Sequence, residues 1–180
     1  MEQRGPWKIK EIVDVYDSKW LKLSEFRVVH PDRSDGIFPV AKIIDGVSVL
    51  PIDDKGNVYL IKEYKFALGE EDIECASGAQ EEGDSFLEAA KKELKEELGI
   101  EAEEWIDLGS VFPHTTNVQS EQKMYVARGL KFGETDRETG EEGIRSMKVP
   151  FEKAVEMAMK GEIKLMVSQL LILKAKEFLS

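Results

Sequence analysis

The sequence predicts an α+β fold, layered as an α/β/α sandwich and preceded by a separate antiparallel β-unit. Three observations predict it. The first third of the chain is rich in Val, Ile and aromatic residues, an amphipathic helix begins near residue 85, and two further helical segments close the chain. We expect residues 1–44 to form the N-terminal β-unit and residues 45–180 to form the main domain.

The predicted strands of the first third are separated by turn residues. His30 to Gly36 and Asp53 to Asn57 combine Pro, Asp, Ser, Gly and Asn, which favour tight turns. The expected strands are 7–16, 20–29, 37–44, 47–52 and 58–64. A meander of antiparallel strands is the simplest arrangement of these segments.

The central helix is predicted by a stripe of apolar residues. Leu87, Ala90, Leu94 and Leu98 recur at steps of three or four, which places them on one helix face. Asp84 is positioned to cap the first turn and Gly99 follows the last turn. We therefore expect a helix from about residue 85 to residue 98.

The second half of the chain returns to strands before it ends in helices. The expected strands are 105–112, 123–130 and 144–149, with an acidic loop at 133–143, and the expected helices are 151–160 and 168–179. Ser168 is a suitable N-cap for the last helix.

Charge and composition exclude several classes of function. The 180 residues contain 36 Asp and Glu against 25 Lys and Arg, a net charge of −11, which disfavours binding to nucleic acid or anionic membranes. No apolar run is long enough to cross a bilayer, and the N-terminal residues lack the apolar core of a secretory signal. The single cysteine, Cys75, has no partner for an internal disulfide, so we expect a cytoplasmic protein.

Three carboxylates crowd one region of the central helix. Glu93 and Glu97 are four residues apart on one face, and Glu96 is beside them. Two interpretations are open at this point. The cluster is either a solvated face with ordinary Glu–Lys pairs, such as Lys92 with Glu96, or a site for a hard divalent cation such as Mg²⁺ or Mn²⁺.

The spacing of residues 78–100 resembles the Nudix box, G-x5-E-x7-R-E-U-x-E-E-x-G-U, where U is a bulky aliphatic residue. Asp84 and Lys92 are like-charged replacements for Glu and Arg. The seven identical or equivalent positions are Gly78, Glu93, Leu94, Glu96, Glu97, Gly99 and Ile100. The preceding segments Glu63-Tyr64-Lys65 and Glu74-Cys75-Ala76-Ser77-Gly78 are similar to the ADP-ribose pyrophosphatase branch of Nudix hydrolases, and so is the tail at 149–163.

The resemblance implies a metal-dependent hydrolase of a pyrophosphate bond. It makes Glu93 and Glu97 metal ligands, Glu96 a ligand or catalytic partner of the metal, and the Ser77 carbonyl a further ligand. Metals of this kind activate water and neutralise charge on the phosphates. The expected cofactor is Mg²⁺ or Mn²⁺.

The same branch often carries another carboxylate, a ligand or general base, on a mobile loop after the box. Glu141 and Glu142 occupy the matching region, between Gly140 and Gly143. The alternative is an ordinary acidic turn.

The resemblance also implies residues that bind substrate. Tyr64 and Lys65 occupy the positions of a Tyr-Arg pair, and Glu121 matches an acid that binds a ribose hydroxyl. Trp20 and Arg27 are candidates for nucleotide contact if the N-terminal unit swaps onto a neighbouring subunit, so we expect a homodimer.

The leading hypothesis is hydrolysis of ADP-ribose or another nucleoside diphosphate sugar to a nucleoside monophosphate and a sugar phosphate. Two alternatives remain open. One is a non-catalytic nucleotide-binding module, motivated by Lys92 and by the missing Pro-Ala before Gly78. The other is a Nudix hydrolase of a different nucleotide sugar, a dinucleoside polyphosphate or FAD, because substrate choice depends on loops.

Overall fold

A computed structural model describes residues 2–135 and 143–179. The chain divides into two compact units. The first contains residues 1–45 and 112–121, and the second contains residues 46–111 and 122–180. Residues 112–121, which we expected in the main domain, group with the first unit, where residues 118–119 form a strand that pairs with β4.

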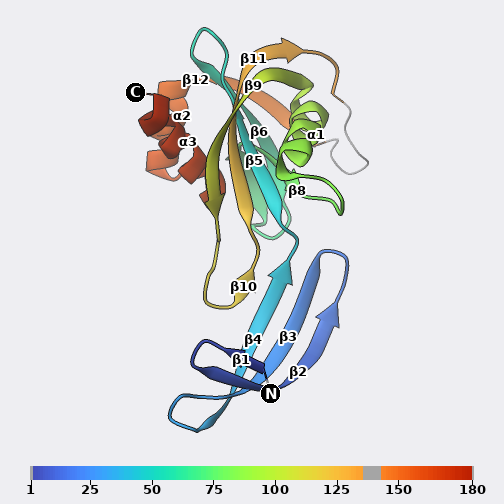
Figure 1. Ribbon diagram of the computed structural model, residues 1–180. Coiled ribbons are helices and arrows are strands. Elements are labelled where there is room, and N and C mark those ends of the chain that lie inside the picture. Colours follow the sequence, from blue (N-terminus) through green and yellow to red (C-terminus); the bar gives the residue numbers. More distant parts are fainter. Residues whose placement is uncertain (1, 136–142, 180) are drawn as a thin grey trace. The chain divides into compact units, whose positions relative to one another are not determined.

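The first unit is a five-stranded sheet in the order β1-β2-β3-β4-β10. Its strands are β1 (Glu2–Arg4), β2 (Trp7–Asp17), β3 (Leu21–Val29), β4 (Asp35–Ile43) and β10 (Val118–Gln119). Neighbouring strands are antiparallel except for β10, which runs parallel to β4. Figure 1 shows β2, β3 and β4 side by side as successive hairpins. In the turn between β3 and β4, Asp32 accepts hydrogen bonds from the backbone and hydroxyl of Ser34.

The second unit combines two sheets with three helices. Its strands are β5 (Gly46–Pro51), β6 (Asn57–Lys65), β7 (Glu70–Glu74), β8 (Ala76–Ala79), β9 (Ile100–Val111), β11 (Gln122–Phe132) and β12 (Arg145–Pro150). Its helices are α1 (Phe86–Leu98), α2 (Phe151–Lys160) and α3 (Met166–Leu179). The sheets have the orders β8-β5-β11-β9 and β12-β6-β7.

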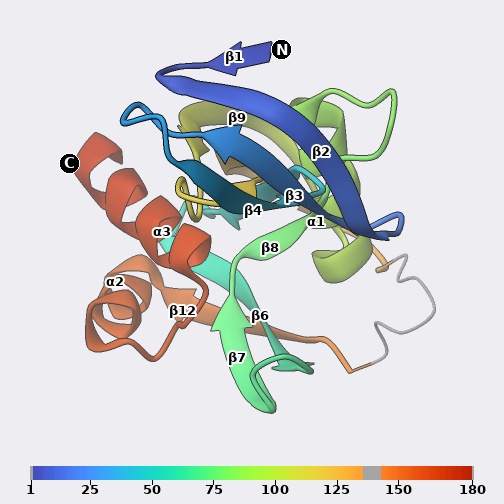
Figure 2. The same cartoon turned by 90° about the horizontal axis from the view of Figure 1, so that it is seen from below.

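Two apolar cores lie on opposite sides of the strands. Val47 and Val49 of β5 pack with Leu94 of α1 in one core, whereas Leu50 packs with Leu171 and other residues of α2 and α3 in the second core. Figures 1 and 2 show α1 on one side of the strands of this unit and α2 with α3 on the other. The α+β fold and the α/β/α layering predicted from the sequence are therefore confirmed.

The start of the last predicted helix differs from expectation. Ser168 is not an N-cap, because α3 begins at Met166 and Ser168 lies buried within it. The apolar stripe of α3 extends two residues further toward the N-terminus than the cap signal indicated. Within the part of the chain that the structure describes, no helix is long and apolar enough to span a membrane.

Candidate functional site

Helix α1 carries the predicted metal ligands, and local signals determine where it begins and ends. Its N-cap is Ser85, not Asp84 as predicted. The Ser85 hydroxyl accepts the N–H of Glu88, and the Glu88 carboxylate accepts the N–H of Ser85, so the two residues form a capping box. A glutamate three residues after Ser85 decides between the two adjacent cap candidates. Gly99 ends the helix with a left-handed backbone, as predicted.

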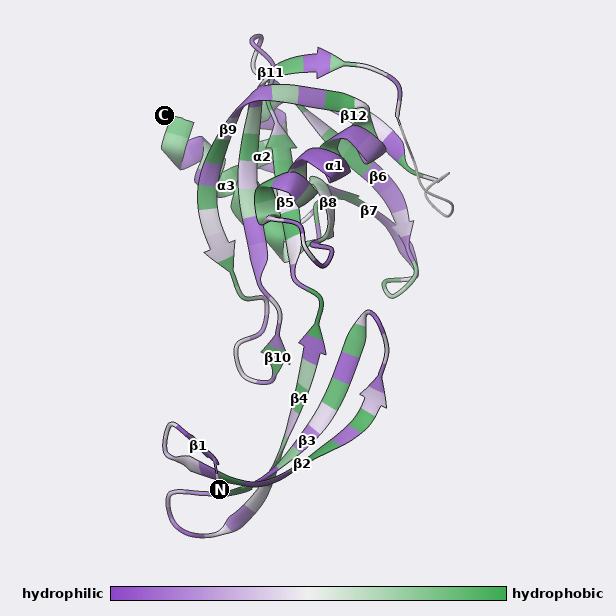
Figure 3. Ribbon diagram, turned by 45° about the vertical axis from the view of Figure 1, so that its right-hand side comes forward, coloured by the Kyte–Doolittle hydropathy of each residue, from purple (hydrophilic) through white to green (hydrophobic). Residues whose placement is uncertain are grey.

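The buried face of α1 brings its carboxylates against strand β8. Ala90 and Leu94 are fully buried, while Glu93 and Glu96 flank this stripe and are partly buried. Figure 3 shows hydrophilic and hydrophobic stretches alternating along α1, as expected for a helix with one buried face.

Glu97 is the most buried of the three carboxylates. Its side chain is inside the protein, with the residue only 4% exposed, and its Oε2 accepts the backbone N–H of Ser77 at 2.9 Å. Burial raises the pKa of Glu97 to about 9, and the nearby charge of Glu93 acts in the same direction, although the Ser77 hydrogen bond opposes both. A carboxylate in this position is therefore strongly stabilised by a cation.

Glu93 lies against Gly78, the next residue along β8. A Cβ atom at position 78 would overlap the carboxylate of Glu93, so only glycine leaves room for this side chain. Glu93 and Glu97 thus contact two consecutive residues, Gly78 and Ser77. This explains the glycine at the start of the motif.

Glu96 lies near Lys92. The ammonium group of Lys92 is 3.0 Å from a carboxylate oxygen of Glu81 and 4.0 Å from one of Glu96. Across residues 2–135 and 143–179, no three Asp, Glu, His or Cys side chains converge in metal-binding geometry. Glu93 and Glu97 both contact β8, and Glu96 lies within 4.0 Å of Lys92 on the same helix. The assignment of these three carboxylates as metal ligands stays a prediction.

The donors nevertheless fit a hard divalent cation. Carboxylate and carbonyl oxygens are the ligands that Mg²⁺ and Mn²⁺ prefer, and the Glu93 carboxylate occupies the space that a side chain at position 78 would fill. Glu93, Glu97 and the Ser77 carbonyl are the residues that would hold such an ion, with Glu96 nearby.

Lys65 and Tyr64 lie at the end of β6. Lys65 forms ion pairs with Glu63 at 2.5 Å and with Glu74, which is only 3% exposed. Burial lowers the pKa of Lys65, but these two carboxylates outweigh that effect and raise it, so the lysine is charged. Tyr64 is exposed. A cavity of about 390 Å³ opens beside Lys65 and Glu74, and Asp72, Lys164 and Met166 also line it.

The other predicted substrate residues lie in the first unit. Trp20 is exposed with the Lys19 ammonium 4.5 Å from its ring centre, and Arg27 pairs with Glu11 at 2.7 Å. The backbone N–H of Glu121 donates to Asp45 at 2.6 Å. Glu141 and Glu142 lie outside the described residues.

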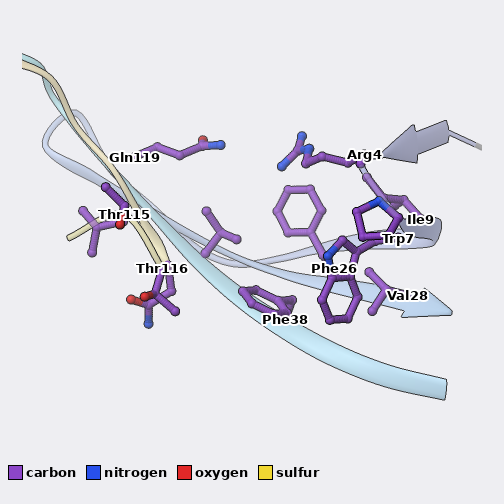
Figure 4. Close-up of a pocket in the computed structure, with 14 residues that line it drawn as sticks. Arg4, Trp7, Ile9, Phe26, Val28, Phe38, Thr115, Thr116 and Gln119 are labelled. Atoms are coloured by element: carbon purple, nitrogen blue, oxygen red, sulfur yellow. The ribbon is translucent and has the colours of Figure 1, made fainter. Parts of the chain in front are cut away.

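A separate pocket of about 450 Å³ lies on the first unit and includes none of the predicted site residues. Trp7, Phe26 and Phe38 form its aromatic wall, with the Arg4 guanidinium 4.8 Å from the centre of the Phe26 ring (Figure 4). Its polar end is formed by residues 115–119.

Comparison with known proteins identifies the family. The NUDIX domain model matches residues 42–168, which is most of the chain. The chain belongs to the Nudix family. A curated relative, the ADP-ribose pyrophosphatase of Bacillus subtilis (strain 168), is 25% identical over 150 residues, covering 83% of this chain and 81% of the relative. A solved structure described as an ADP compounds hydrolase superposes with a TM-score of 0.85 at 17% identity, covering 99% of this chain and 97% of that one, and it supports the fold.

The protein is thus a Nudix pyrophosphohydrolase similar to ADP-ribose pyrophosphatase, as the sequence resemblance predicts. Nudix hydrolases generally use divalent metals, and the donor set described above is compatible with that property.

Several residues of this Nudix site are not among the sequence candidates. Glu74 lies in the quoted motif but has no predicted role, and the structure pairs it with Lys65. Glu81 pairs with Lys92 and Ser48 contacts Ser77, although neither carries a sequence signal that distinguishes it from an ordinary surface or strand residue.

Proposed function

We propose that this Nudix protein hydrolyses the pyrophosphate bond of ADP-ribose or another nucleoside diphosphate sugar, using Mg²⁺ or Mn²⁺. Water adds to one phosphorus, the bond from that phosphorus to the bridging oxygen breaks, and the products are a nucleoside monophosphate and a sugar phosphate. The observation that carries the proposal is the pairing of Glu97 with Ser77 and of Glu93 with Gly78.

Different residues are proposed to hold the metal ion and to contact the phosphates. A bound divalent ion supplies Lewis-acid activation and charge neutralisation. Glu93, Glu97 and the Ser77 carbonyl would hold this ion. Lys92 orients the carboxylate of Glu96. The charged Lys65, which pairs with Glu63 and Glu74, also lines the cavity of about 390 Å³ and is proposed to contact a phosphate there.

Substrate selection is proposed from the relatives and from the positions of polar groups. The name of the Bacillus subtilis relative and the description of the solved structure both refer to ADP compounds. Tyr64 and Lys65 are proposed to contact the substrate, and Glu121 to bind a ribose hydroxyl. Trp20 and Arg27 are proposed to contact the nucleotide of a neighbouring subunit, onto which the N-terminal unit would swap. Glu141 or Glu142 is proposed as the general base.

The assembly is proposed to be a cytoplasmic homodimer built through the first unit. Ile12, Val15, Tyr16 and Ile37 are exposed apolar side chains on this sheet. Exposed apolar residues gathered on one sheet are typical of interfaces.

A phosphatase-coupled assay tests the reaction. Phosphatase acts on the monophosphate products but not on intact ADP-ribose, so phosphate release should depend on both the enzyme and Mg²⁺ or Mn²⁺. A panel of nucleotide sugars, dinucleoside polyphosphates and FAD would rank the substrates. Absence of turnover on every member by folded protein would refute the proposal.

A further inference from the structure

Cys75 stands at the point where the chain passes from one sheet to the other. Strand β7 ends at Glu74 in the three-stranded sheet, and β8 begins at Ala76 in the four-stranded sheet. Neither strand ladder includes Cys75, and the residue is fully buried. Its backbone N–H and carbonyl therefore need partners other than a neighbouring strand.

Serine hydroxyls supply both partners. The Ser168 hydroxyl accepts the N–H of Cys75 at 3.0 Å, and the Ser77 hydroxyl donates to the carbonyl of Cys75 at 2.9 Å. Ser168 is fully buried on α3, where an apolar residue would otherwise be expected. The backbone N–H of Cys75 is thus hydrogen-bonded to α3, and its carbonyl is hydrogen-bonded to β8.

Ser48 extends this arrangement. Its hydroxyl is 3.0 Å from that of Ser77, directly across the ladder between β5 and β8. The single hydroxyl proton of Ser77 goes to the Cys75 carbonyl, so Ser48 is the donor in this pair. Ser48 is also fully buried.

Strand β8 is contacted by the Ser48 hydroxyl on one side of the sheet and by the Glu97 carboxylate on the other. Side chains alternate along β5, with Val47 and Val49 in the core beneath α1 and Leu50 in the core beneath α3, so Ser48 faces α3. The backbone of Ser77 reaches Glu97 on α1. Any shift of β8 would therefore change the distance between Ser77 and Glu97.

We propose that Ser48 and Ser168 are positioning residues for the metal-binding carboxylates, acting through Cys75 and Ser77. This inference rests on the proposed function. Loss of the Ser168 hydroxyl leaves the buried N–H of Cys75 without its acceptor, and loss of the Ser48 hydroxyl removes the hydrogen bond that it donates to Ser77. In each case β8 shifts in response. The geometry of Ser77 relative to Glu97 then relaxes, and metal affinity falls.

The experiment measures the Mn²⁺ dissociation constant of the folded protein by electron paramagnetic resonance, without substrate. Variants S48A and S168A should each bind Mn²⁺ about 10-fold to 100-fold more weakly than the parent. The matched control is I172V, which changes a fully buried residue of the same helix α3 without removing a hydrogen bond. It should lower thermal stability but leave the Mn²⁺ dissociation constant unchanged.

The outcomes separate this inference from the proposed function. Parental Mn²⁺ affinity in folded S48A and S168A, together with ADP-ribose hydrolysis by the parent, would overturn the positioning role alone. A folded parent that neither binds Mn²⁺ nor hydrolyses the diphosphate panel would overturn both. If S168A fails to fold, S48A still decides. The double variant S48A/S77A should then bind Mn²⁺ no more weakly than S77A alone, because the Ser48 hydroxyl acts only through that of Ser77.

Discussion

The carboxylate of Glu97 accepts the backbone N–H of Ser77 at 2.9 Å while the residue is only 4% exposed. One hydrogen bond does not compensate a buried negative charge, which is why burial raises the pKa of Glu97 to about 9. The buried charge of Glu97 therefore lowers the stability of the folded protein, and a bound cation would relieve this cost.

The first prediction concerns E97Q in the presence of a chelator. The ordinary pKa is 4.5, so between that value and about 9 the folded parent binds more protons than the unfolded chain. Stability associated with this proton is present below pH 4.5 and is lost as pH rises toward 9, with a slope of up to about 1.4 kcal/mol per pH unit. The neutral amide has no such dependence, so E97Q should be more stable than the parent at pH 8.

Urea unfolding at pH 5, 6.5 and 8 measures this difference. E97Q should also show no stabilisation by Mn²⁺ and little hydrolysis. A gap between E97Q and the parent that stays constant across the three pH values would contradict the assignment of a raised pKa to Glu97.

The second prediction concerns G78A. The added methyl group would overlap the Glu93 carboxylate, which can swing away because it is the end of a flexible side chain. We expect a folded protein with hydrolytic activity reduced about 10-fold to 100-fold. The control G133A adds a methyl group whose nearest neighbour is 3.7 Å away, so it should leave kcat unchanged. Equal activity in the two variants would refute the role of the glycine.

Local periodicity predicted much of this fold. The stripe formed by Leu87, Ala90, Leu94 and Leu98 correctly indicated α1, and Gly99 correctly indicated its end. The start was misjudged because Asp84 and Ser85 are both good caps, although the glutamate at position 88 favoured Ser85.

Long-range pairing accounts for what the sequence did not reveal. Residues 118–119 join β4 of the first unit through a parallel pairing that no local pattern marks. Likewise, Ser48 and Ser168 look like ordinary residues of a strand and a helix until the fold brings both to the crossover at Cys75. The spacing of the box predicted which carboxylates to examine, but the contacts of Glu97 with Ser77 and of Glu93 with Gly78 depend on how α1 packs against β8.

The third prediction concerns K92R. The Lys92 ammonium is 3.0 Å from Glu81 and 4.0 Å from Glu96. It is therefore within hydrogen-bond distance of Glu81 but too far from Glu96 for a hydrogen bond. The planar fork of arginine can donate to both at once. We expect kcat/KM to rise about threefold to tenfold, the value of an added charge-assisted hydrogen bond.

The control for K92R is K91R, because Lys91 is an exposed neighbour on the same helix. Steady-state kinetics at saturating Mg²⁺ would compare the two. A similar change in both variants would show that arginine acts through general charge or helix propensity rather than by orienting Glu96.

The fourth prediction tests the homodimer. Ile37 on β4 is 61% exposed, so I37D places a charge at an exposed apolar position on the face of the sheet that also carries Arg27. A dimer that uses this face should dissociate to monomers, as measured by light scattering during size-exclusion chromatography. The control F178D alters an equally exposed apolar residue of α3 in the second unit and should leave the mass unchanged. Identical masses for I37D and the parent would exclude this face as the interface.

The last prediction concerns Asp53, in the turn that joins β5 to β6. Burial raises its pKa, but hydrogen bonds from Lys148, Asn57 and Tyr59 outweigh this effect and hold the pKa well below the ordinary value of 3.8. The carboxylate is 2.8 Å from both the Lys148 ammonium and the Asn57 backbone N–H. Its contribution to stability is therefore present above pH 3.8 and is lost as pH falls toward the depressed pKa.

D53N keeps the shape of the side chain but loses its charge. We therefore expect its free energy of unfolding at pH 7 to be lower than that of the parent by about 1.5–3 kcal/mol. The difference should narrow as pH falls from 5 to 3, because the unfolded parent binds a proton at Asp53 at a higher pH than the folded parent does. D54N, at an exposed neighbouring position, should match the parent throughout. The proposed metal ligands lie on α1 and β8, whereas Asp53 lies in the turn between β5 and β6, so Mn²⁺ affinity should not change in D53N. A stability gap as large at pH 3 as at pH 7 would mean that the turn depends on the shape of Asp53 rather than on its charge.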